Sequence, residues 1–280
     1  MATAAKKAEL QNSTALFVIM ASDKGGVGKS FFFRFLAEHL RKHKGESVLL
    51  FDGDGGTGSS FRIFGTRDAD GFLIEDQNPA VGIMQYNLRK ARPRETLINS
   101  VTLGGAITLH DLPGGAFDAM TEIADNGDES LHGIFEGVLS EGQQPVVFHL
   151  VHHEDESTES VARYLDATEG LEIKHIAVLN FRDADSKEDF EMWFGYTDEH
   201  GEKIGGRTRE RLLASGGFEL IVPRLAPSAA SRIKRYNLTF EQATTDKRLT
   251  LAQRTQVSRW YREMTKALME NDAFKALFDL

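Results

Sequence analysis

Short apolar runs rich in β-branched residues alternate with helix-length amphipathic stretches along most of this chain. This alternation is the pattern of repeated βα units, in which helices connect parallel strands. It predicts an α/β fold with a mostly parallel central sheet that is flanked by helices on both faces. The predicted strands are residues 16–21, 47–51, 106–110, 145–151, 175–180 and 218–222.

Two helices are indicated by apolar residues that recur at helical spacing. The first follows strand 16–21 and ends at Gly45. The second is a long helix near the end of the chain, whose apolar stripe we interpret as a packing surface. A further helix is predicted at residues 208–214, before the last strand. Residues 183–206, which are first acid-rich and then glycine-rich, form an excursion before that helix. The two apolar series are Phe33, Leu36, Ala37 and Leu40, and Val257, Trp260, Tyr261, Met264 and Leu268.

Length and composition favour one large globular domain. The chain has 280 residues, of which 41% are hydrophobic, and no cysteine. The lack of cysteine excludes disulfides, thiolate nucleophiles and cysteine-held iron–sulfur clusters. No apolar run approaches the roughly 20 residues that cross a bilayer. We therefore expect a flexible polar tail over residues 1–14 and one domain over residues 15–280, in a cytoplasmic protein without a membrane partner.

The charge is unevenly distributed along the chain. The formal net charge is −9, but residues 224–266 contain ten Lys or Arg and only three Asp or Glu. One interpretation is a solvated face whose cations pair with acids elsewhere. The other is a surface that contacts the phosphates of non-specific DNA, with Arg232, Lys234 and Arg235 as the candidate residues.

The most informative segment is a glycine-rich loop between the first predicted strand and the first predicted helix. Its glycines allow a tight turn that points backbone N–H groups at an anion, and the helix adds the positive end of its dipole. Lys29 can bridge phosphate oxygens, and the Ser30 hydroxyl can ligate Mg²⁺. Asp23 stands at the first glycine of the usual G-x-x-x-x-G-K-[ST] pattern, and a second lysine, Lys24, follows it. The expected nucleotide-binding residues of this loop are Gly25, Gly26, Val27, Gly28, Lys29, Ser30 and Phe31.

Residues 24–30, KGGVGKS, resemble the deviant Walker A motif of the ParA/MinD ATPases, a family of P-loop NTPases. The resemblance implies ATP as nucleotide, Mg²⁺ as its cation and a homodimer that forms on ATP. It further implies that Lys24 reaches the phosphates of the facing subunit and stabilises charge on the transferred phosphoryl group. The chain departs from the family at Phe31, where a second hydroxyl residue is common, so we expect weaker nucleotide binding.

Two predicted strands end in carboxylates, at the edge where ligands bind in open α/β sheets. Asp52 and Asp54 are spaced i, i+2, which puts both on one side of an extended strand. By resemblance to the family's A′ motif, Asp52 lies near the Mg²⁺ shell and Asp54 orients the attacking water. By resemblance to its Walker B segment, Asp111 holds Mg²⁺ through water. The following Gly114 and Gly115 form a loop able to respond to the γ-phosphate.

The resemblance also implies a base pocket at the ends of the last two predicted strands, where Asn180, Pro223 and Leu225 are the candidates to hold adenine. Residues 180–183, NFRD, approximate the N-K-x-D signature by which GTPases read guanine. Phe181 replaces the lysine of that signature, so ATP is favoured over GTP.

Histidines cluster at the end of strand 145–151, where His149, His152 and His153 precede Glu154 and Asp155. Imidazoles can ligate transition metals. We interpret these residues instead as surface or strand-end histidines, because His149 belongs to the strand while His152 and His153 begin a loop.

A ParA-like ATPase that positions a plasmid or other replicon, or acts in conjugative transfer, is the favoured function. The basic region supports it, and residues 271–280 lack the basic amphipathic membrane helix of a division-site protein. Expected partners are a second copy of the chain, non-specific DNA and an activating DNA-binding or adaptor protein. The alternatives are a MinD-like ATPase with another cargo, a cofactor-assembly enzyme with a similar loop, and a nucleotide-binding scaffold with negligible turnover.

Overall fold

A seven-stranded sheet forms the centre of the molecule in the computed structural model, which describes residues 14–55, 58–123 and 130–280. The strand order is β3-β2-β4-β1-β5-β6-β9, and all neighbouring strands are parallel. The predicted tail lies outside the described residues except for Thr14. The strands are β1 (Leu16–Ala21), β2 (Val48–Asp52), β3 (Met84–Gln85), β4 (Ile107–Asp111), β5 (Gln144–Val151), β6 (Lys174–Asn180) and β9 (Phe218–Val222).

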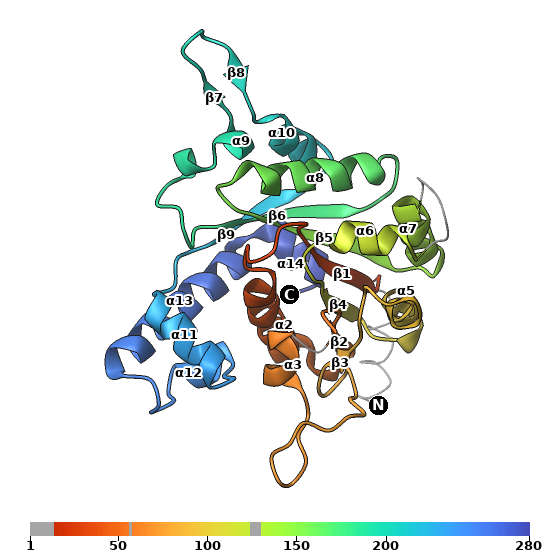
Figure 1. Cartoon of the computed structure of the whole chain (residues 1–280), viewed down its shortest axis with the longest axis vertical. Coiled ribbons are helices and arrows are strands. Elements are labelled where there is room, and N and C mark those ends of the chain that lie inside the picture. Colours follow the sequence, from red (N-terminus) through yellow and green to blue (C-terminus); the bar gives the residue numbers. More distant parts are fainter. Residues whose placement is uncertain (1–13, 56–57, 124–129) are drawn as a thin grey trace.

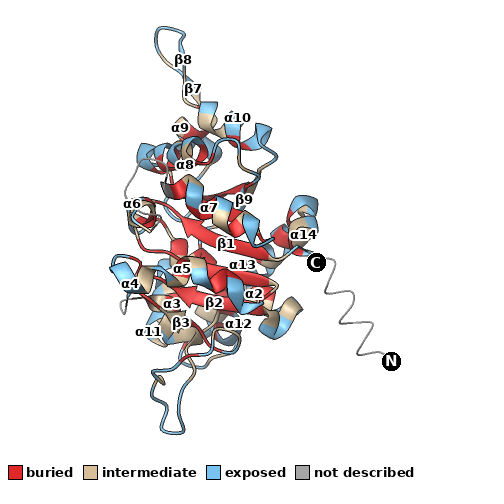
Figure 2. Cartoon of the chain, turned by 90° about the vertical axis from the view of Figure 1, so that its right-hand side faces the viewer, coloured by how far each residue is buried: buried red, intermediate tan, exposed pale blue. Residues whose placement is uncertain are grey.

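The predicted α/β class is confirmed, and all six predicted strands form. Strand β3 was not predicted, because two residues are too short to produce a pattern. Helices cover both faces of the sheet (Figure 1). The central strands between them are buried (Figure 2), whereas the edge strands β3 and β9 are partly exposed. On one face lie α2 (Lys29–Lys44), α3 (Ser59–Phe64), α11 (Pro227–Arg235), α12 (Phe240–Ala243), α13 (Leu251–Glu270) and α14 (Asp272–Phe278).

The other face carries shorter helices that connect the strands. The remaining helices are α4 (Ala91–Arg94), α5 (Thr96–Asn99), α6 (Ala116–Thr121), α7 (Ser130–Ser140), α8 (Asp155–Ala167), α9 (Glu191–Phe194) and α10 (Arg207–Ala214). Three 3₁₀ turns are η1 (Gly45–Ser47), η2 (Ser100–Leu103) and η3 (Lys187–Asp189). No helix of the described segments is long and apolar enough to cross a membrane.

Strand β1 shows how the two helical layers share the sheet. Leu16, Val18 and Met20 belong to the core beneath α2 and the C-terminal helices. Phe17 and Ile19 point to the opposite core, because successive strand residues face opposite sides. The apolar stripes predicted for α2 and α13 are both packing surfaces, as expected, and α2 ends at Gly45, which has a positive φ of 60°.

The predicted excursion after β6 forms a small hairpin, β7 (Tyr196–Thr197) and β8 (Lys203–Ile204), that projects from the molecule (Figure 1, top). The fully buried Trp193 anchors its base. The indole Nε1 donates to the Glu219 carboxylate at 2.7 Å, and Arg209 pairs with the same carboxylate at 2.9 Å. The excursion is therefore tied to β9 and α10, while its tip lies in solvent.

Four histidines are buried within the sheet and its helices: His39, His110, His149 and His175. His149 lies in the predicted strand, near its carboxyl end, but it is buried and not at the surface, and its Nε2 meets His175 Nδ1 at 2.9 Å. Burial lowers the pKa of His39 and of His175 to about 4, and that of His110 to about 3. These rings are therefore neutral in the folded protein.

We expect the free energy of unfolding to fall as the pH drops below about 6.5, the pKa of an unfolded-state histidine. The unfolded chain then binds protons that the folded chain excludes until about pH 4. Each buried histidine contributes a slope of up to about 1.4 kcal/mol per pH unit in this window. His39→Leu should reduce the slope of the unfolding free energy against pH by the contribution of one histidine. Urea unfolding at several pH values measures this slope. Substituting the exposed His200 by Leu is the control, and equal slopes for wild type and His39→Leu would contradict the assignment.

Candidate functional site

The loop between β1 and α2 lines a cavity of about 460 Å³ at the carboxyl edge of the sheet. Two of its glycines, Gly26 and Gly28, have positive φ values of 80° and 102°. A Cβ on Gly28 would lie 2.4 Å from the Asn180 amide nitrogen, which donates to the Val27 carbonyl at 2.7 Å. The end of β6 thus closes against the loop, and two predicted parts of the site, far apart in sequence, are neighbours.

Lys29 is buried beneath this loop. Its Nζ donates to the carbonyls of Ser22 and Lys24, both at 2.9 Å. Burial lowers the pKa of Lys29 to about 8, although the nearby Asp111 charge raises it. The amine is therefore held at the floor of the cavity, where Ser30 also contributes to the lining.

Asp23, which stands in place of the first Walker glycine, fixes the loop to α8. Its carboxylate accepts a hydrogen bond from the Ser160 hydroxyl at 3.2 Å and pairs with Arg163 at 3.4 Å. Its carbonyl accepts the Gly115 N–H at 2.9 Å. The aspartate therefore connects the phosphate loop both to a neighbouring helix and to the glycine loop that follows β4.

The predicted carboxylates meet at the ends of neighbouring strands. Asp52 and Asp111 are register partners in β2 and β4, and both are buried. The Asp52 oxygens accept N–H groups of Asp54 at 3.1 Å and Phe61 at 3.0 Å. The Ser60 hydroxyl donates to Asp111 Oδ2 at 2.6 Å. Burial and then the neighbouring Asp52 charge raise the pKa of Asp111 to about 7.

This arrangement fits a magnesium ion. The second oxygen of Asp111, Oδ1, is buried and has no hydrogen-bond partner within the described segments. Asp52 supplies a second carboxylate, and Ser30 opens the neighbouring helix with a hydroxyl. Mg²⁺ prefers such hard oxygen ligands and keeps several waters. The residues present are therefore suited to hold the cation, and burial without one is unfavourable for two adjacent carboxylates.

Asp54 points toward a residue that the sequence reasoning missed. Its carboxylate pairs with Arg89 at 3.1 Å, and the same guanidinium donates to the Gly114 carbonyl at 3.0 Å. Arg89 comes from the irregular region after β3, where no periodicity marks its position. It links the segment after β2 to the glycine loop after β4, and it lines the same cavity as the loop between β1 and α2.

The two lysines of the loop point to different places. Lys24 forms ion pairs with Glu154 and, at 3.4 Å, with Glu156, at the start of α8 in the same chain. The hydrogen bond from Lys24 lowers the pKa of Glu154, and the same bond raises the pKa of Lys24. The acids that hold Lys24 were not predicted, because only the fold brings α8 next to the loop.

A second cavity, of about 420 Å³, lies beside the first and is lined by all three residues predicted for the base: Asn180, Pro223 and Leu225. Its volume is in the range typical of small-molecule sites. The two cavities adjoin, because four lining residues are common to both. These shared residues are Gly28, Phe31, Arg34 and Lys234.

Phe31, the departure from the family pattern, packs edge-on against Phe240 and Trp260, with ring centroids 4.9 and 5.2 Å away. The aromatic ring therefore joins α2 to the C-terminal helices. Arg34, one turn later, is buried, and its guanidinium lies 5.7 Å from the Phe31 centroid. Its Nε donates to the Ser30 carbonyl, while Nη1 has no partner among the residues described. The sequence analysis did not single out Arg34, because nothing in the local pattern distinguishes it.

Asp183, the acid of the approximate N-K-x-D signature, is engaged within the chain. Its Oδ2 accepts from Arg182 Nε at 2.5 Å and lies 3.2 Å from His152 Nε2. Asp183 and Arg182 also line the second cavity.

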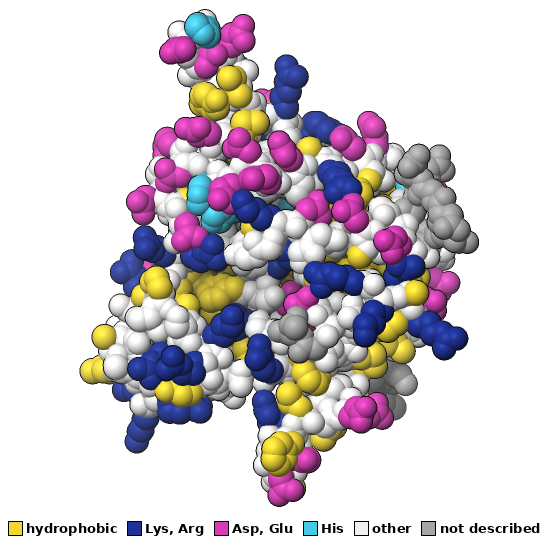
Figure 3. Space-filling view, viewed as in Figure 1, with side chains coloured by type: hydrophobic (Ala, Val, Ile, Leu, Met, Phe, Trp, Pro, Cys, Tyr) yellow, Lys and Arg dark blue, Asp and Glu magenta, His cyan; other side chains and the backbone are white. Residues whose placement is uncertain are grey.

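The basic region is divided between several environments. Of the predicted DNA contacts, Lys234 lines both cavities, and Arg232 donates to the Tyr236 hydroxyl at 2.8 Å. Lysines and arginines gather over α11–α13, whereas acids gather over α8–α10 (Figure 3). Four of the ten cations pair with acids: Arg224 with Asp185, Arg248 with Asp246, Arg259 with Glu263, and Lys266 with Glu270.

No protein-family model and no curated protein sequence matches this chain. Among solved structures, it is similar to the MinC:MinD cell division complex of Aquifex aeolicus, with 14% identity, a TM-score of 0.43, and coverage of 90% of this chain and 96% of that one. It is similar to a McdA–ATP complex from Cyanothece, with 10% identity, a TM-score of 0.46, and coverage of 93% and 99%. It also resembles cobyrinic acid a,c-diamide synthase of Mycobacterium smegmatis with a bound ATP analogue and magnesium, with 13% identity, a TM-score of 0.40, and coverage of 80% and 93%. At these low identities and TM-scores, the comparison indicates a similar course of the backbone only. Any conclusion about function must therefore rest on the residues of this chain.

The close approach of Asn180 to the loop predicts that Gly28→Ala destabilises the ligand-free protein by about 1–3 kcal/mol. Alanine there would have to adopt a positive φ and displace the Asn180 amide. Gly25→Ala is the matched control, since no atom lies within 4 Å of its added Cβ, and we expect a change within about 0.5 kcal/mol. Denaturant unfolding of both variants measures the difference. Equal stabilities would contradict the contact.

Proposed function

We propose that this chain is a Mg²⁺-dependent ATPase of the ParA/MinD kind, which dimerises on ATP and dissociates after slow hydrolysis. The observation that carries the proposal is the junction of the two cavities. One is lined by the glycines, Lys29 and Ser30 of the glycine-rich loop, beside a pair of buried carboxylates, and the other is lined by Asn180, Pro223 and Leu225. A nucleoside triphosphate has the phosphates, cation and base that such a joined site requires.

In this proposal the loop amides and Lys29 bind the terminal phosphates. Ser30, Asp52 and Asp111 hold Mg²⁺, the latter two through water, and the bound cation neutralises charge on the phosphate oxygens. Asp54 orients the attacking water. Because Arg89 pairs with Asp54 in this structure, that role requires the pair to open or to turn with the glycine loop.

Lys24 has a separate role in the dimer, where it reaches the phosphates of the facing subunit. Its present partners, Glu154 and Glu156, are exposed, and exposed ion pairs contribute little to stability. Exchange of these carboxylates for phosphate oxygens in the facing subunit therefore costs little. A triphosphate offers more negative charge at that place than a diphosphate, which makes the dimer depend on ATP.

Arg34 and Lys234 compensate for the hydroxyl missing at position 31. Both line the junction between the phosphate and base cavities, where the α-phosphate of a nucleotide would lie. A buried guanidinium with an unpaired nitrogen is suited to bind that phosphate, because charge-assisted hydrogen bonds to phosphate are strong.

We expect Lys24→Ala to bind ATP with little change in affinity but to stay monomeric, because the lysine acts on the facing subunit. Wild type should elute as a dimer with ATP and as a monomer with ADP in gel filtration with light scattering. Asp54→Ala is the matched control: it should bind ATP and dimerise, while turnover falls by about a hundredfold or more. A wild type that is monomeric with ATP would contradict the proposal. Equal and negligible turnover in wild type and Asp54→Ala would indicate a scaffold instead of an ATPase.

We further propose that the ATP-bound dimer binds non-specific DNA through the basic region, in partition or conjugative transfer of a replicon. Under this proposal an activating DNA-binding or adaptor protein stimulates hydrolysis and releases the DNA. The excess of cations over α11–α13 supports this role (Figure 3), whereas the four ion pairs with acids reduce the charge available to phosphates.

Substitution of two neighbouring basic residues, Lys234 and Arg235, tests nucleotide binding and DNA binding separately. Lys234→Ala should weaken ATP and ADP binding by about tenfold, or about 1.4 kcal/mol, because Lys234 lines both cavities. Arg235→Ala should leave nucleotide affinity unchanged and reduce the salt dependence of DNA binding by about one phosphate contact. Fluorescent-nucleotide titration and DNA binding between 50 and 200 mM salt measure both. DNA binding that ignores salt, or survives charge reversal of Arg232 and Arg235, would contradict the DNA surface.

A further inference from the structure

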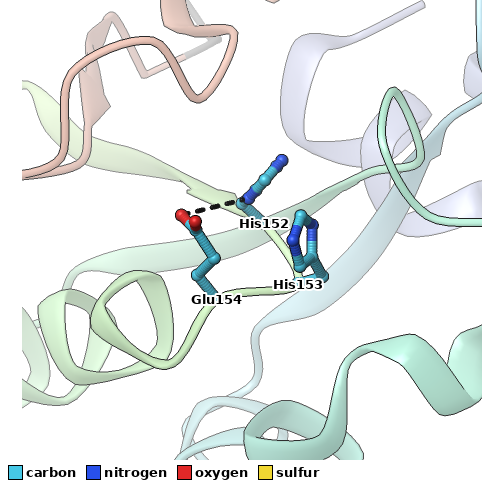
Figure 4. A group of neighbouring side chains, drawn as sticks. All are labelled: His152, His153 and Glu154. Atoms are coloured by element: carbon cyan, nitrogen blue, oxygen red, sulfur yellow. Dashed lines mark ion pairs between the residues drawn. The ribbon is translucent and has the colours of Figure 1, made fainter.

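Three consecutive residues after β5, His152, His153 and Glu154, bring possible metal ligands together (Figure 4). One ligand atom from each lies within 4.8 Å of the other two. The Nδ1 atom of His152 lies 3.7 Å from a Glu154 carboxylate oxygen. The group lies beside the phosphate loop, since Glu154 also binds Lys24.

The Nδ1 atoms of both histidines in this group are buried. His152 begins the loop after β5, as predicted, but it is only 7% exposed and is not a surface residue. Its Nδ1 and that of His153 are both buried, and neither has a hydrogen-bond partner in the part of the chain that is described. Buried polar atoms normally have partners, so two adjacent nitrogens without one point to a missing ligand.

The environment of His152 assigns its ring nitrogens. Nε2 lies 3.2 Å from the carboxylate of Asp183, which can only accept a hydrogen bond when ionised. Nε2 therefore carries the proton, and Nδ1 presents a lone pair toward Glu154. Burial lowers the pKa of His152 and favours the neutral ring. A carboxylate that orients a histidine through its other nitrogen is the usual support of a metal-binding imidazole.

We propose that His152, His153 and Glu154 bind a divalent transition-metal ion of the zinc class, with Asp183 as a positioning residue and water in the remaining position. Two imidazoles and one carboxylate suit such an ion. Ligands that share one ion at 2.0–2.2 Å are at most about 4.2–4.4 Å apart. The three ligand atoms lie within 4.8 Å of one another, so the site forms when these side chains move closer together around the ion.

Metal binding at this site competes with Lys24, because both use the Glu154 carboxylate. A bound ion would leave Lys24 held only by Glu156, at 3.4 Å. The ion would therefore favour the release of Lys24 toward the facing subunit. This consequence rests on the proposed function of Lys24, whereas the metal site itself does not.

The test is a titration of the untagged, nucleotide-free chain with Zn²⁺ by calorimetry and with Co²⁺ by visible absorption, with Mg²⁺ in excess to occupy oxygen-only sites. We expect one equivalent of Zn²⁺ and Co²⁺ bands typical of nitrogen and oxygen ligands. His153→Ala, at a half-buried position, and Glu154→Gln, at an exposed one, should each weaken binding by more than about tenfold. His200→Ala, at another exposed histidine next to a glutamate, is the control and should change nothing. Equal affinity in wild type and His153→Ala, or no saturable binding, would overturn the site.

A second variant tests the competition with Lys24 without any nucleotide. Lys24→Met should tighten Zn²⁺ binding severalfold, because Glu154 is then free to turn to the ion. Unchanged affinity would overturn the link to Lys24. Since these titrations contain no ATP, failure of the metal site and failure of the ATP-dependent dimer are separate results.

Discussion

Two buried carboxylates, Asp52 and Asp111, are forced together by the parallel pairing of β2 and β4, which puts them in register at the sheet edge. Burial raises the pKa of both, and the charge of Asp52 raises the pKa of Asp111 further. Nearby groups donate hydrogen bonds to these carboxylates. The backbone N–H of Phe61, in the first turn of α3, donates to Asp52, and the Ser60 hydroxyl donates to Asp111. Oδ1 of Asp111 has no hydrogen-bond partner among the described residues. A bound cation would neutralise these two buried charges. The adjacent glycine-rich loop, if it holds a phosphate, would supply further oxygen ligands for that cation.

The phosphate loop separates two lysines by environment. Lys29 is desolvated beneath the loop and satisfied by carbonyls, so it is positioned before any nucleotide binds. Lys24 is on the outside and paired with acids of α8, so it can change partners at low cost. The same motif thus provides one fixed charge and one exchangeable charge. Glu154 stands between the exchangeable lysine and the buried imidazole of His152, which joins the phosphate loop to the end of β5.

The strands, the main helices and most of the site could be predicted from the sequence, because their signals are local. A run of glycines before a lysine indicates an anion-binding loop. A carboxylate at the end of a predicted strand indicates the ligand-binding edge of an α/β sheet. Arg34 and Arg89 could not be found in this way. Their importance comes from neighbours far away in the chain: the C-terminal helices beside Arg34, and the loop after β4 beside Arg89.

By itself, the sequence determined the layered α/β architecture and the edge of the sheet at which the loop, the carboxylates and the base residues gather. Buried runs, helical periodicity and glycine turns follow from short-range sterics and from the exclusion of apolar side chains from water. Only the tertiary structure decided which charges meet. It buried His149 against His175, gave Lys24 its acids and turned Lys234 toward the cavities. It also placed the His152 Nδ1 near Glu154, without a hydrogen-bond partner among the described residues. The physical reason is that hydrogen bonds and ion pairs act over a few ångströms, so they depend on the register and packing of segments that are distant in the chain.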